Sequence, residues 1–335
     1  MRKQRVCLFF LFLLFSSLIG TSNLLAAPYY QGKVITLIVG FSAGGGYDRM
    51  FRLVARHLPN HIPGKPTVIV DNMPGGDSIT ATNHLYNVAK PDGLTIGGVS
   101  KTLPFVQLLK VGGMKFDLTK FAWLCSASVD SSLFYIRNDL PYKSMQDLQK
   151  AEKTIFVAGQ GPTAFGTQYS LMLMNFLKLN AKLVDYGGTP ETILALERKE
   201  TDAAVFAYNS GKPYVDRGLV RPLLRTSVSQ KGIEHIPVDV DLVSEKMGKT
   251  VVSMLASVNR MGKPLIAPPG TPAEVVKTLR DAFAKTINDP GFLADAEKSK
   301  MDVEYVRPED CLKALQYVFN QPADVVKEFG KFVKF

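Results

Sequence analysis

The sequence predicts an α/β protein made of two lobes, each a mostly parallel sheet flanked by helices. Short β-branched apolar runs alternate with segments of helical periodicity in the first part of the chain, an alternation typical of βαβ units. A second set of such elements follows, and no Gly/Ser-rich linker separates the two sets. About 308 residues remain after an N-terminal leader, which is enough for two lobes with a sizeable core.

The first 27 residues have the features of an export leader. A basic stretch containing Arg2, Lys3 and Arg5 precedes the apolar run 6–20, and small residues follow up to Ala27. This order is typical of a secretory signal peptide, and the apolar run is shorter than the roughly 20 residues of a spanning helix. We therefore expect residues 1–27 to be a signal peptide and the mature chain to be soluble in the periplasm, with an uncleaved anchor as the alternative.

Composition argues against several classes of function. Removal of the leader lowers the formal charge from +10 to +7, and the remaining basic residues are spread along the chain. No nucleic-acid-binding motif is present, so we expect no nucleic-acid partner. Cys125, Cys311 and the four histidines show no metal-site spacing, so we expect no metal and no cofactor. We expect two separately buried thiols, although an oxidising compartment would also allow a disulfide.

The first predicted strand, Val34–Val39, runs into a glycine-rich loop and then into a helix that begins near Asp48. Gly44, Gly45 and Gly46 leave backbone N–H groups uncovered at this helix N-terminus. Such N–H groups and the positive end of the helix dipole attract anions, and glycine allows a close approach. The loop therefore predicts a carboxylate or phosphate site, or alternatively a tight turn in which Gly45 adopts a positive φ.

Other interpretations of this loop are weaker. Tyr47 and Asp48 stand where a P-loop needs Lys followed by Ser or Thr, and the glycine spacing differs from a dinucleotide fingerprint. Residues 40–44 do fit G-x-S-x-G, with Ser42 as the nucleophile of a secreted esterase. However, Ser42 follows the first strand, and His235 is followed by about 100 residues, whereas the hydrolase fold places its elbow deep in the sheet and its histidine near the end.

The remaining elements are predicted from hydrophobic spacing and turn residues. In the first part we expect helices at 49–58 and 78–89 and strands at 67–70 and 94–99. The second part is expected to contain strands at 133–137, 154–158, 182–186 and 203–207 and helices at 164–177 and 190–197. The last part is expected to contain a strand at 264–267, helices at 308–319 and 322–332, and a helix from Pro272 with a capping box of Thr271 and Glu274. Crossovers between lobes are expected near 124–132 and 225–231.

A second glycine-rich junction between a strand and a helix lies at 158–163. Its layout is similar to that of the first junction, and it belongs to the second set of elements. Two anion-binding junctions, one in each lobe, would enclose a small ligand if they faced each other at the carboxyl ends of the strands.

Six segments then resemble one family in order and spacing, over essentially the whole mature chain: 40–48, 71–76, 89–95, 159–163, 185–190 and 267–272. The family is that of the TctC-like receptors of tripartite tricarboxylate transporters, the Bug-type solute-binding proteins. The resemblance implies a two-lobe periplasmic binding protein fold (type II-like), with lobe 1 formed by 28–127 and 229–335 and lobe 2 by 128–228. It also implies a monomeric receptor, not an enzyme, which captures a small carboxylate or dicarboxylate and delivers it to the membrane subunits of a transporter.

The resemblance also implies ligand contacts, which fall in four segments of this chain. The residues are Phe41, Ser42, Ala43, Gly44, Gly45, Gly46 and Tyr47; Ser100, Lys101 and Thr102; Gly159, Gly161, Thr163, Ala164 and Phe165; and Tyr208 and Asn209. The family usually has Pro at position 42, Thr at 47 and an acid near 208, so we expect a more aromatic cleft that does not bind an amino acid. For Tyr47, Phe165 and Tyr208 the sequence leaves two interpretations, a core residue or a ligand contact. For Lys101 the two interpretations are a solvated charge and a ligand contact.

Two functions share these site residues. The first is a receptor that presents a carboxylate to a transporter, and the second is a receptor that reports the ligand to a membrane signalling protein. The sequence of the chain alone does not separate them.

Overall fold

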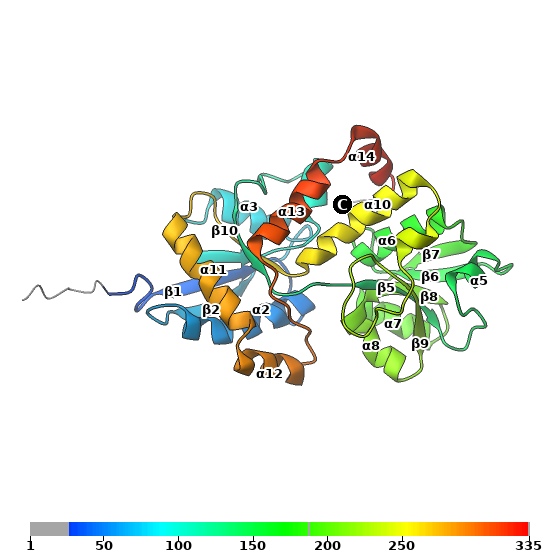
Figure 1. Cartoon of the computed structure of the whole chain (residues 1–335), viewed down its shortest axis with the longest axis horizontal. Helices are drawn as coiled ribbons and strands as arrows, with labels where there is room; N and C mark the ends of the chain where they lie inside the picture. Colours follow the sequence, from blue (N-terminus) through cyan, green and yellow to red (C-terminus); the bar gives the residue numbers. More distant parts are fainter. Residues whose placement is uncertain (1–26, 187, 334–335) are drawn as a thin grey trace, which may run out of the picture.

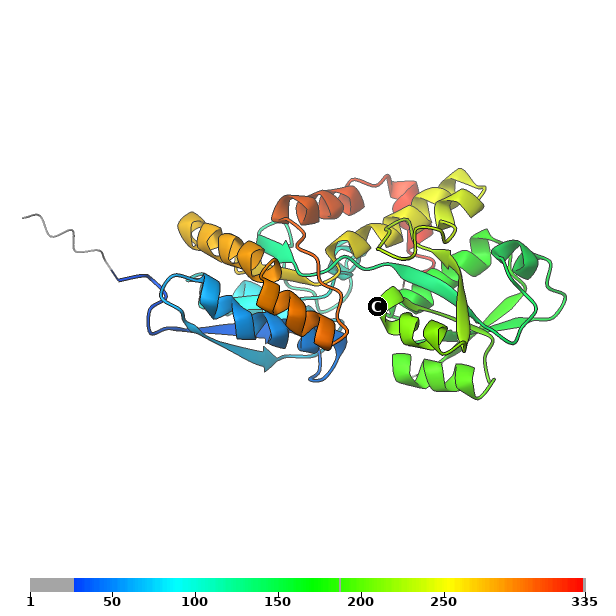
Figure 2. The same ribbon diagram turned by 60° about the horizontal axis from the view of Figure 1, so that its bottom comes forward.

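The computed structural model describes residues 27–186 and 188–333, so the predicted leader lies almost entirely outside the described residues. Within these ranges the strands form two five-stranded sheets with the orders β2-β1-β3-β10-β4 and β7-β6-β8-β5-β9. Figures 1 and 2 show the sheets in two lobes that lie side by side along the long axis of the molecule. The predicted fold class, a two-lobe α/β protein, is confirmed.

The first sheet is parallel except for one strand. Its strands are β1 (Val34–Val39), β2 (Thr67–Asn72), β3 (Thr95–Gly98), β4 (Ala122–Ser126) and β10 (Pro264–Ala267). Strand β1 pairs in parallel with β2 and β3, whereas β10 is antiparallel to both of its neighbours. Because parallel strands end at the same edge of a sheet, the loops that follow β1, β2 and β3 lie together.

The second sheet repeats this pattern. Its strands are β5 (Ser132–Arg137), β6 (Ile155–Gly159), β7 (Ala181–Asp185), β8 (Ala203–Ala207) and β9 (Val220–Arg225). Strand β6 is parallel to β7 and β8, and β5 is antiparallel to β8 and β9. The loop after β6 therefore lies at the carboxyl edge of its sheet, as the loop after β1 does in the first lobe.

Helices pack on both sheets. Those of the first lobe are α2 (Gly46–His57), α3 (Ile79–Asn87), α4 (Leu103–Leu108), α11 (Ala273–Ile287), α12 (Pro290–Lys298) and α13 (Pro308–Phe319). Those of the second lobe are α5 (Met145–Gln149), α6 (Phe165–Phe176), α7 (Thr189–Glu197) and α8 (Tyr208–Asp216). The others are α9 (Asp239–Leu242), α10 (Lys246–Ser257), α14 (Ala323–Phe329), and the short η2 (Leu58–His61) and η3 (Val258–Met261). None of the helices among the described residues is long and apolar enough to span a membrane.

One hydrophobic core runs through both lobes. It contains Val106 of α4, Leu255 of α10 and Leu173 of α6, and α10 contacts α6, α13 and α14. Figure 1 shows α10 and α13 along one edge of the molecule, across the boundary between the lobes. Separate clusters fill the other faces of the sheets, around Phe51 in the first lobe and Phe206 in the second. The lobes are thus joined firmly along one edge.

Several local predictions need correction. The capping box at Thr271 is wrong, because the Thr271 hydroxyl donates to the Pro268 carbonyl at 2.8 Å and α11 begins at Ala273. Strands β4 and β9 and helices α4, α5, α8, α9, α10 and α12 were not predicted. The strands at 34–39, 203–207 and 264–267 and the helix at 308–319 match the prediction, and the other predicted elements are present with shifted ends. Cys125 and Cys311 are both buried and free, as expected.

Candidate functional site: two helix N-termini at the boundary between the lobes

The glycine-rich loop after β1 has one glycine with a left-handed backbone. Gly44 has φ +85°, whereas Gly45 is the N-cap of α2 with φ −72° and ψ 172°. The expectation that Gly45 requires positive φ is therefore wrong, because Gly45 is in an extended conformation open to any residue. A Cβ atom added at Gly44 or Gly46 would meet no atom within 4 Å. The main chain of this loop consequently faces open space.

One donor of the loop is already used inside the protein. The N–H of Gly44 donates to Oδ2 of Asp48 at 2.8 Å, and Arg52 and Asn72 donate to the same carboxylate. The N–H groups of Gly45, Gly46 and Tyr47 make no hydrogen bond to the part of the chain that the structure describes. These three donors, at the positive end of α2, are available to an anion.

Two aromatic rings cover one side of this loop. Phe41 and Tyr47 are stacked with their ring centroids 4.1 Å apart, and both are half-buried. The N–H of Lys101 donates to the Tyr47 hydroxyl at 3.2 Å, which ties the first turn of α2 to the loop after β3. Tyr47 is therefore packed against Phe41 and tied to the loop after β3, with only part of its surface exposed.

The loop after β3 is bound to a carboxylate that was not predicted as a site residue. The Ser100 hydroxyl donates to Oδ2 of Asp77 at 3.0 Å, and the Thr102 hydroxyl donates to the same oxygen. Burial raises the pKa of Asp77, and the Thr102 and Ser100 hydroxyls oppose that rise. Asp77 and Ser78 have left-handed φ values of 52° and 71°, a costly backbone conformation of the kind found at functional sites. Asp77 thus fixes the hydroxyls of Ser100 and Thr102.

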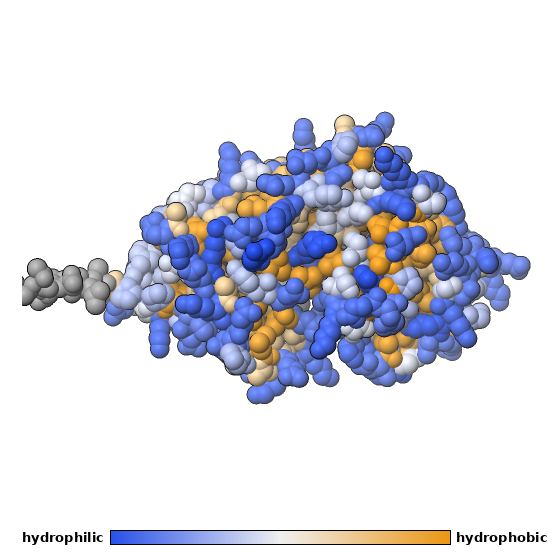
Figure 3. Space-filling view, in the orientation of Figure 1, coloured by the Kyte–Doolittle hydropathy of each residue, from blue (hydrophilic) through white to orange (hydrophobic). Residues whose placement is uncertain are grey.

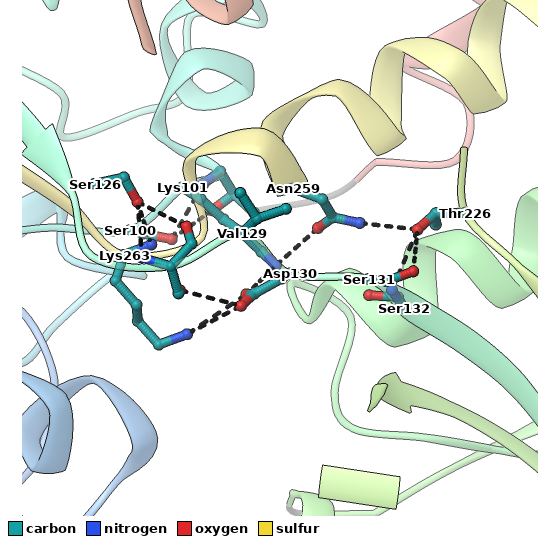
Figure 4. A network of polar contacts seen from close by, with 12 residues as sticks. Ser100, Lys101, Ser126, Val129, Asp130, Ser131, Ser132, Thr226, Asn259 and Lys263 are labelled. Atoms are coloured by element: carbon teal, nitrogen blue, oxygen red, sulfur yellow. Dashed lines mark hydrogen bonds and ion pairs between the residues drawn. The ribbon is translucent and has the colours of Figure 1, made fainter. Parts of the chain in front are cut away.

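Lys101 is a buried, paired charge rather than a solvated one. Its Nζ lies 2.7 Å from Oδ2 of Asp130 and donates to Oδ1 of Asn259 at 2.8 Å. Lys263 approaches the same carboxylate, with Nζ 3.4 Å from Oδ1 of Asp130. Burial raises the pKa of Asp130, but the charges of Lys101 and Lys263 outweigh it and hold that pKa well below its usual range. Figure 4 shows the two lysine side chains reaching Asp130 from different directions.

This cluster lies where the chain passes between the lobes. Asp130 stands between β4 and β5, and Asn259 lies in η3, just before the chain returns to the first sheet at β10. Asn259 also donates to the hydroxyl of Thr226, which follows β9 (Figure 4). Lys101, in the loop after β3, is therefore hydrogen-bonded directly to both connections between the sheets.

The second glycine-rich junction has the same layout as the first. Gly161 has φ +91°, and α6 begins after the extended N-cap Ala164. The N–H groups of Phe165 and Gly166 make no hydrogen bond to the described residues, and Thr163 is exposed just before the helix. A second set of main-chain donors therefore stands at the start of α6.

The two lobes meet at Lys101 and Phe165. The Lys101 ammonium lies 5.0 Å from the centroid of the Phe165 ring, within the range of a cation–π contact. This contact joins the second and third predicted segments of the site, and the hydrogen bond from the Lys101 N–H to Tyr47 joins the first segment to the second. Figure 3 shows the surface notched at the boundary between the two lobes, at the lower edge of the view.

The fourth predicted segment lines a neighbouring groove. Tyr208 and Asn209 begin α8, and they border a groove of about 920 Å³ with Met301 and Asp302 of the first lobe on its other side. The N–H of Tyr208 donates to the Ser131 carbonyl at 2.8 Å, which fixes the start of α8 on the connection after β4. Phe41–Tyr47, Ser100–Thr102 and Gly159–Phe165 do not line this groove.

Four residues at the site were missed from the sequence: Asp77, Asp130, Asn259 and Lys263. Lys101 is 29 positions from Asp130 and 158 from Asn259, so no spacing pattern connects them. The one available signal was Asp77, which ends the glycine-containing turn after β2. The arrangement as a whole, two α/β lobes with uncovered helix N-termini at a cleft, defines the class of two-lobe solute-binding receptors.

Comparison with known proteins identifies the family. The family model described as the tripartite tricarboxylate transporter family receptor matches residues 50–331, and the chain belongs to this family. A curated relative, the UPF0065 protein in the gbd 5' region of Cupriavidus necator, is 24% identical over 313 residues, covering 91% of this chain and 90% of the relative. The family consists of solute-binding receptors, so the chain is not an enzyme.

Solved structures have the same fold. A TctC solute-binding protein from Polaromonas matches with a TM-score of 0.68 at 20% identity, covering 87% of this chain and 100% of its own. The R. palustris protein Rpa4515, solved with adipate, matches with a TM-score of 0.67 at 18% identity, covering 89% of this chain and 97% of its own.

Proposed function

We propose that this protein captures a small organic carboxylate in the cleft between its lobes and delivers it to the membrane subunits of a tripartite transporter. The observation that carries the proposal is the pair of uncovered helix N-termini. The free N–H groups of Gly45, Gly46 and Tyr47 stand at the start of α2, and those of Phe165 and Gly166 at the start of α6. Such groups bind a carboxylate without any chemical step.

The charges at the cleft support an anionic ligand. Lys101 and Lys263 share the single carboxylate of Asp130, so the three groups together carry one excess positive charge. The adipate-bound relative supports a carboxylate ligand for this fold. We propose that Tyr47 and Phe165 leave a cleft suited to an acid with an apolar body, not to an amino acid, while Tyr208 borders the neighbouring groove.

The proposal includes a movement of the lobes. The moving bodies would be 28–127 with 229–335, and 128–228. They would flex about the crossovers near 124–132 and 225–231. Neither helix N-terminus alone can replace all the water around a carboxylate, so affinity would require both to converge. Helix α10 contacts α6 of the second lobe and α13 of the first, so it would slide against one of them during closure. We further propose export by the leader and a monomeric receptor.

The test starts from protein purified under native conditions, then denatured, with mass spectrometry of the released small molecules. A thermal-shift screen of aliphatic and aromatic mono- and dicarboxylates follows. We expect at least one stabilising acid with micromolar affinity or better, about −8 kcal/mol. A screen in which no carboxylate stabilises the protein, with no released acid, would overturn the proposal. Deletion of neighbouring membrane-subunit genes then tests delivery, which predicts loss of uptake of the same acid.

A further inference from the structure

Two ammonium groups at the cleft share one carboxylate unequally. Lys101 makes two hydrogen bonds of normal length, with Nζ 2.7 Å from Oδ2 of Asp130 and 2.8 Å from Oδ1 of Asn259. Lys263 lies 3.4 and 3.5 Å from the two oxygens of Asp130, which is longer than the usual 2.7–3.2 Å of an N–H···O hydrogen bond. The Lys263 ammonium therefore has donors that the protein satisfies poorly.

The position of Lys263 points its charge at the first anion-binding loop. Its Nζ lies 4.8 Å from the centroid of the Tyr47 ring, in the first turn of α2. Its side chain is 15% exposed, and in Figure 4 it extends away from the strands toward the open part of the view. Lys263 is held at its main chain, where its N–H donates to the Ser126 hydroxyl at 2.9 Å.

Among the described residues no second acid forms an ion pair with either lysine, and Asp77 acts only from a distance, where its charge raises the pKa of Lys101. The Ser128 hydroxyl also donates to the Asp130 carboxylate, with its Oγ 3.3 Å from Oδ1. The other buried acid nearby, Asp77, is bound to the Ser100 and Thr102 hydroxyls, and no ion pair between it and either lysine is formed among the described residues. The cluster of Lys101, Lys263 and Asp130 thus holds an excess positive charge beside the free N–H groups of α2.

We propose that Lys263 determines ligand specificity by forming a direct ion pair with the carboxylate of the bound acid. Main-chain N–H groups donate to a charged carboxylate or to a neutral carbonyl oxygen, so they discriminate weakly between an acid and its amide. An ammonium that exchanges a loose contact for a charge-assisted hydrogen bond favours the anion strongly. Asp130 stays bound to Lys101 and keeps the connection between the lobes intact. This inference rests on the function proposed above.

The experiment compares binding of acids and their amides by calorimetry. The probes are succinate, adipate and benzoate with succinamide, adipamide and benzamide, measured on the wild type and on Lys263→Met. We expect Lys263→Met to weaken binding of the best carboxylate by about tenfold or more and to change binding of its amide less than about twofold. Lys263→Arg, which restores the charge, should recover most of the affinity. Lys33→Met, which removes an ammonium from the far side of the first lobe, should bind like the wild type.

The outcomes separate the two proposals. If Lys263→Met binds the carboxylate as tightly as the wild type, the role of Lys263 is overturned while the receptor function stands. If the wild type binds none of the probe acids and the wider screen also finds none, the receptor function fails and this inference fails with it. Lys263→Gln, which keeps a polar head group without the charge, is measured in parallel. If Lys263→Met does not fold, the same comparison of carboxylate and amide is made on Lys263→Gln.

Discussion

The ammonium of Lys101 lies 2.7 Å from the carboxylate of Asp130, and both side chains are buried. The pair joins the loop after β3, a predicted ligand segment, to the connection between the two sheets. Asn259 extends the contact to Thr226 at the end of the second sheet. Burial lowers the pKa of Lys101, and the charge of Asp130 opposes that decrease. The site and the connection between lobes are thus parts of one polar network.

Removing the charge of Asp130 should destabilise the fold. Asp130→Asn leaves the ammonium groups of Lys101 and Lys263 without a carboxylate, and breaking a buried pair in this way costs about 3–5 kcal/mol. Urea unfolding measures the change. The matched control is Asp281→Asn, which removes an exposed pair with Lys277 on α11 and should cost less than about 1 kcal/mol. Similar losses in the two variants would contradict a structural role for the buried pair.

A side chain at Gly45 should block ligand binding and spare the fold. A Cβ at this position would have its nearest contact at 3.5 Å, the Ser42 carbonyl oxygen, so Gly45→Val fits the protein but fills the space where an anion would approach. Calorimetry with the carboxylate found by screening should give no measurable binding. Gly112→Val, at an exposed glycine that also has space for a side chain, should bind normally. Normal binding by Gly45→Val would show that the loop is only a turn.

The hydroxyl of Thr163 should contribute to closure from the second lobe. Thr163 is exposed immediately before α6, where its hydroxyl can donate to a carboxylate held by the helix. Thr163→Val should weaken binding about fivefold. At a fixed ligand concentration below saturation, small-angle scattering should show that added ligand decreases the radius of gyration less in Thr163→Val than in the wild type. Thr278→Val on α11 serves as the control. An unchanged affinity in Thr163→Val would remove this residue from the site.

Asp239 should make stability depend on pH. Its Oδ2 accepts the Tyr169 hydroxyl at 2.8 Å, and burial raises its pKa from 3.8 to about 6, partly opposed by Tyr169, Val240 and Arg225. Because the folded state prefers the protonated form, this contribution to stability is complete below about pH 4 and is lost as pH rises through 6. The difference corresponds to about 3 kcal/mol. We expect the unfolding free energy of Asp239→Asn relative to wild type to rise between pH 4 and 7, and a constant difference would contradict the assignment.

Much of the fold could be predicted from local sequence because its strands are short apolar runs that end in turn residues. The strand at 203–207 and the two glycine-rich junctions are examples. Strand β9 was missed because Pro222 interrupts its apolar run, and the structure accommodates this proline at the edge of the sheet, beside a register shift at Phe134 and Tyr135. The predicted capping box is absent because the Thr271 hydroxyl donates to the nearby carbonyl of Pro268 instead.

The site was predictable only where its chemistry lies in the main chain. Glycine-rich junctions reveal uncovered N–H groups locally, so both helix N-termini could be found. The charged cluster could not be found, because Asp130, Asn259 and Lys263 come together only through the crossing of the chain between the lobes. For the same reason the sequence did not decide whether Lys101 is a solvated charge or a ligand contact. In the structure its ammonium is buried and paired with Asp130.

The central claim, that main-chain donors from both lobes hold the ligand, is tested most directly by millisecond hydrogen exchange with mass spectrometry. The amides of Gly45, Gly46 and Tyr47 and those of Phe165 and Gly166 have no hydrogen-bond acceptor among the described residues, so they should exchange rapidly in the free protein. At saturation with the identified carboxylate, we predict slower exchange by tenfold or more in peptides covering both helix starts. Protection at only one helix start, or at neither, would contradict capture between the lobes.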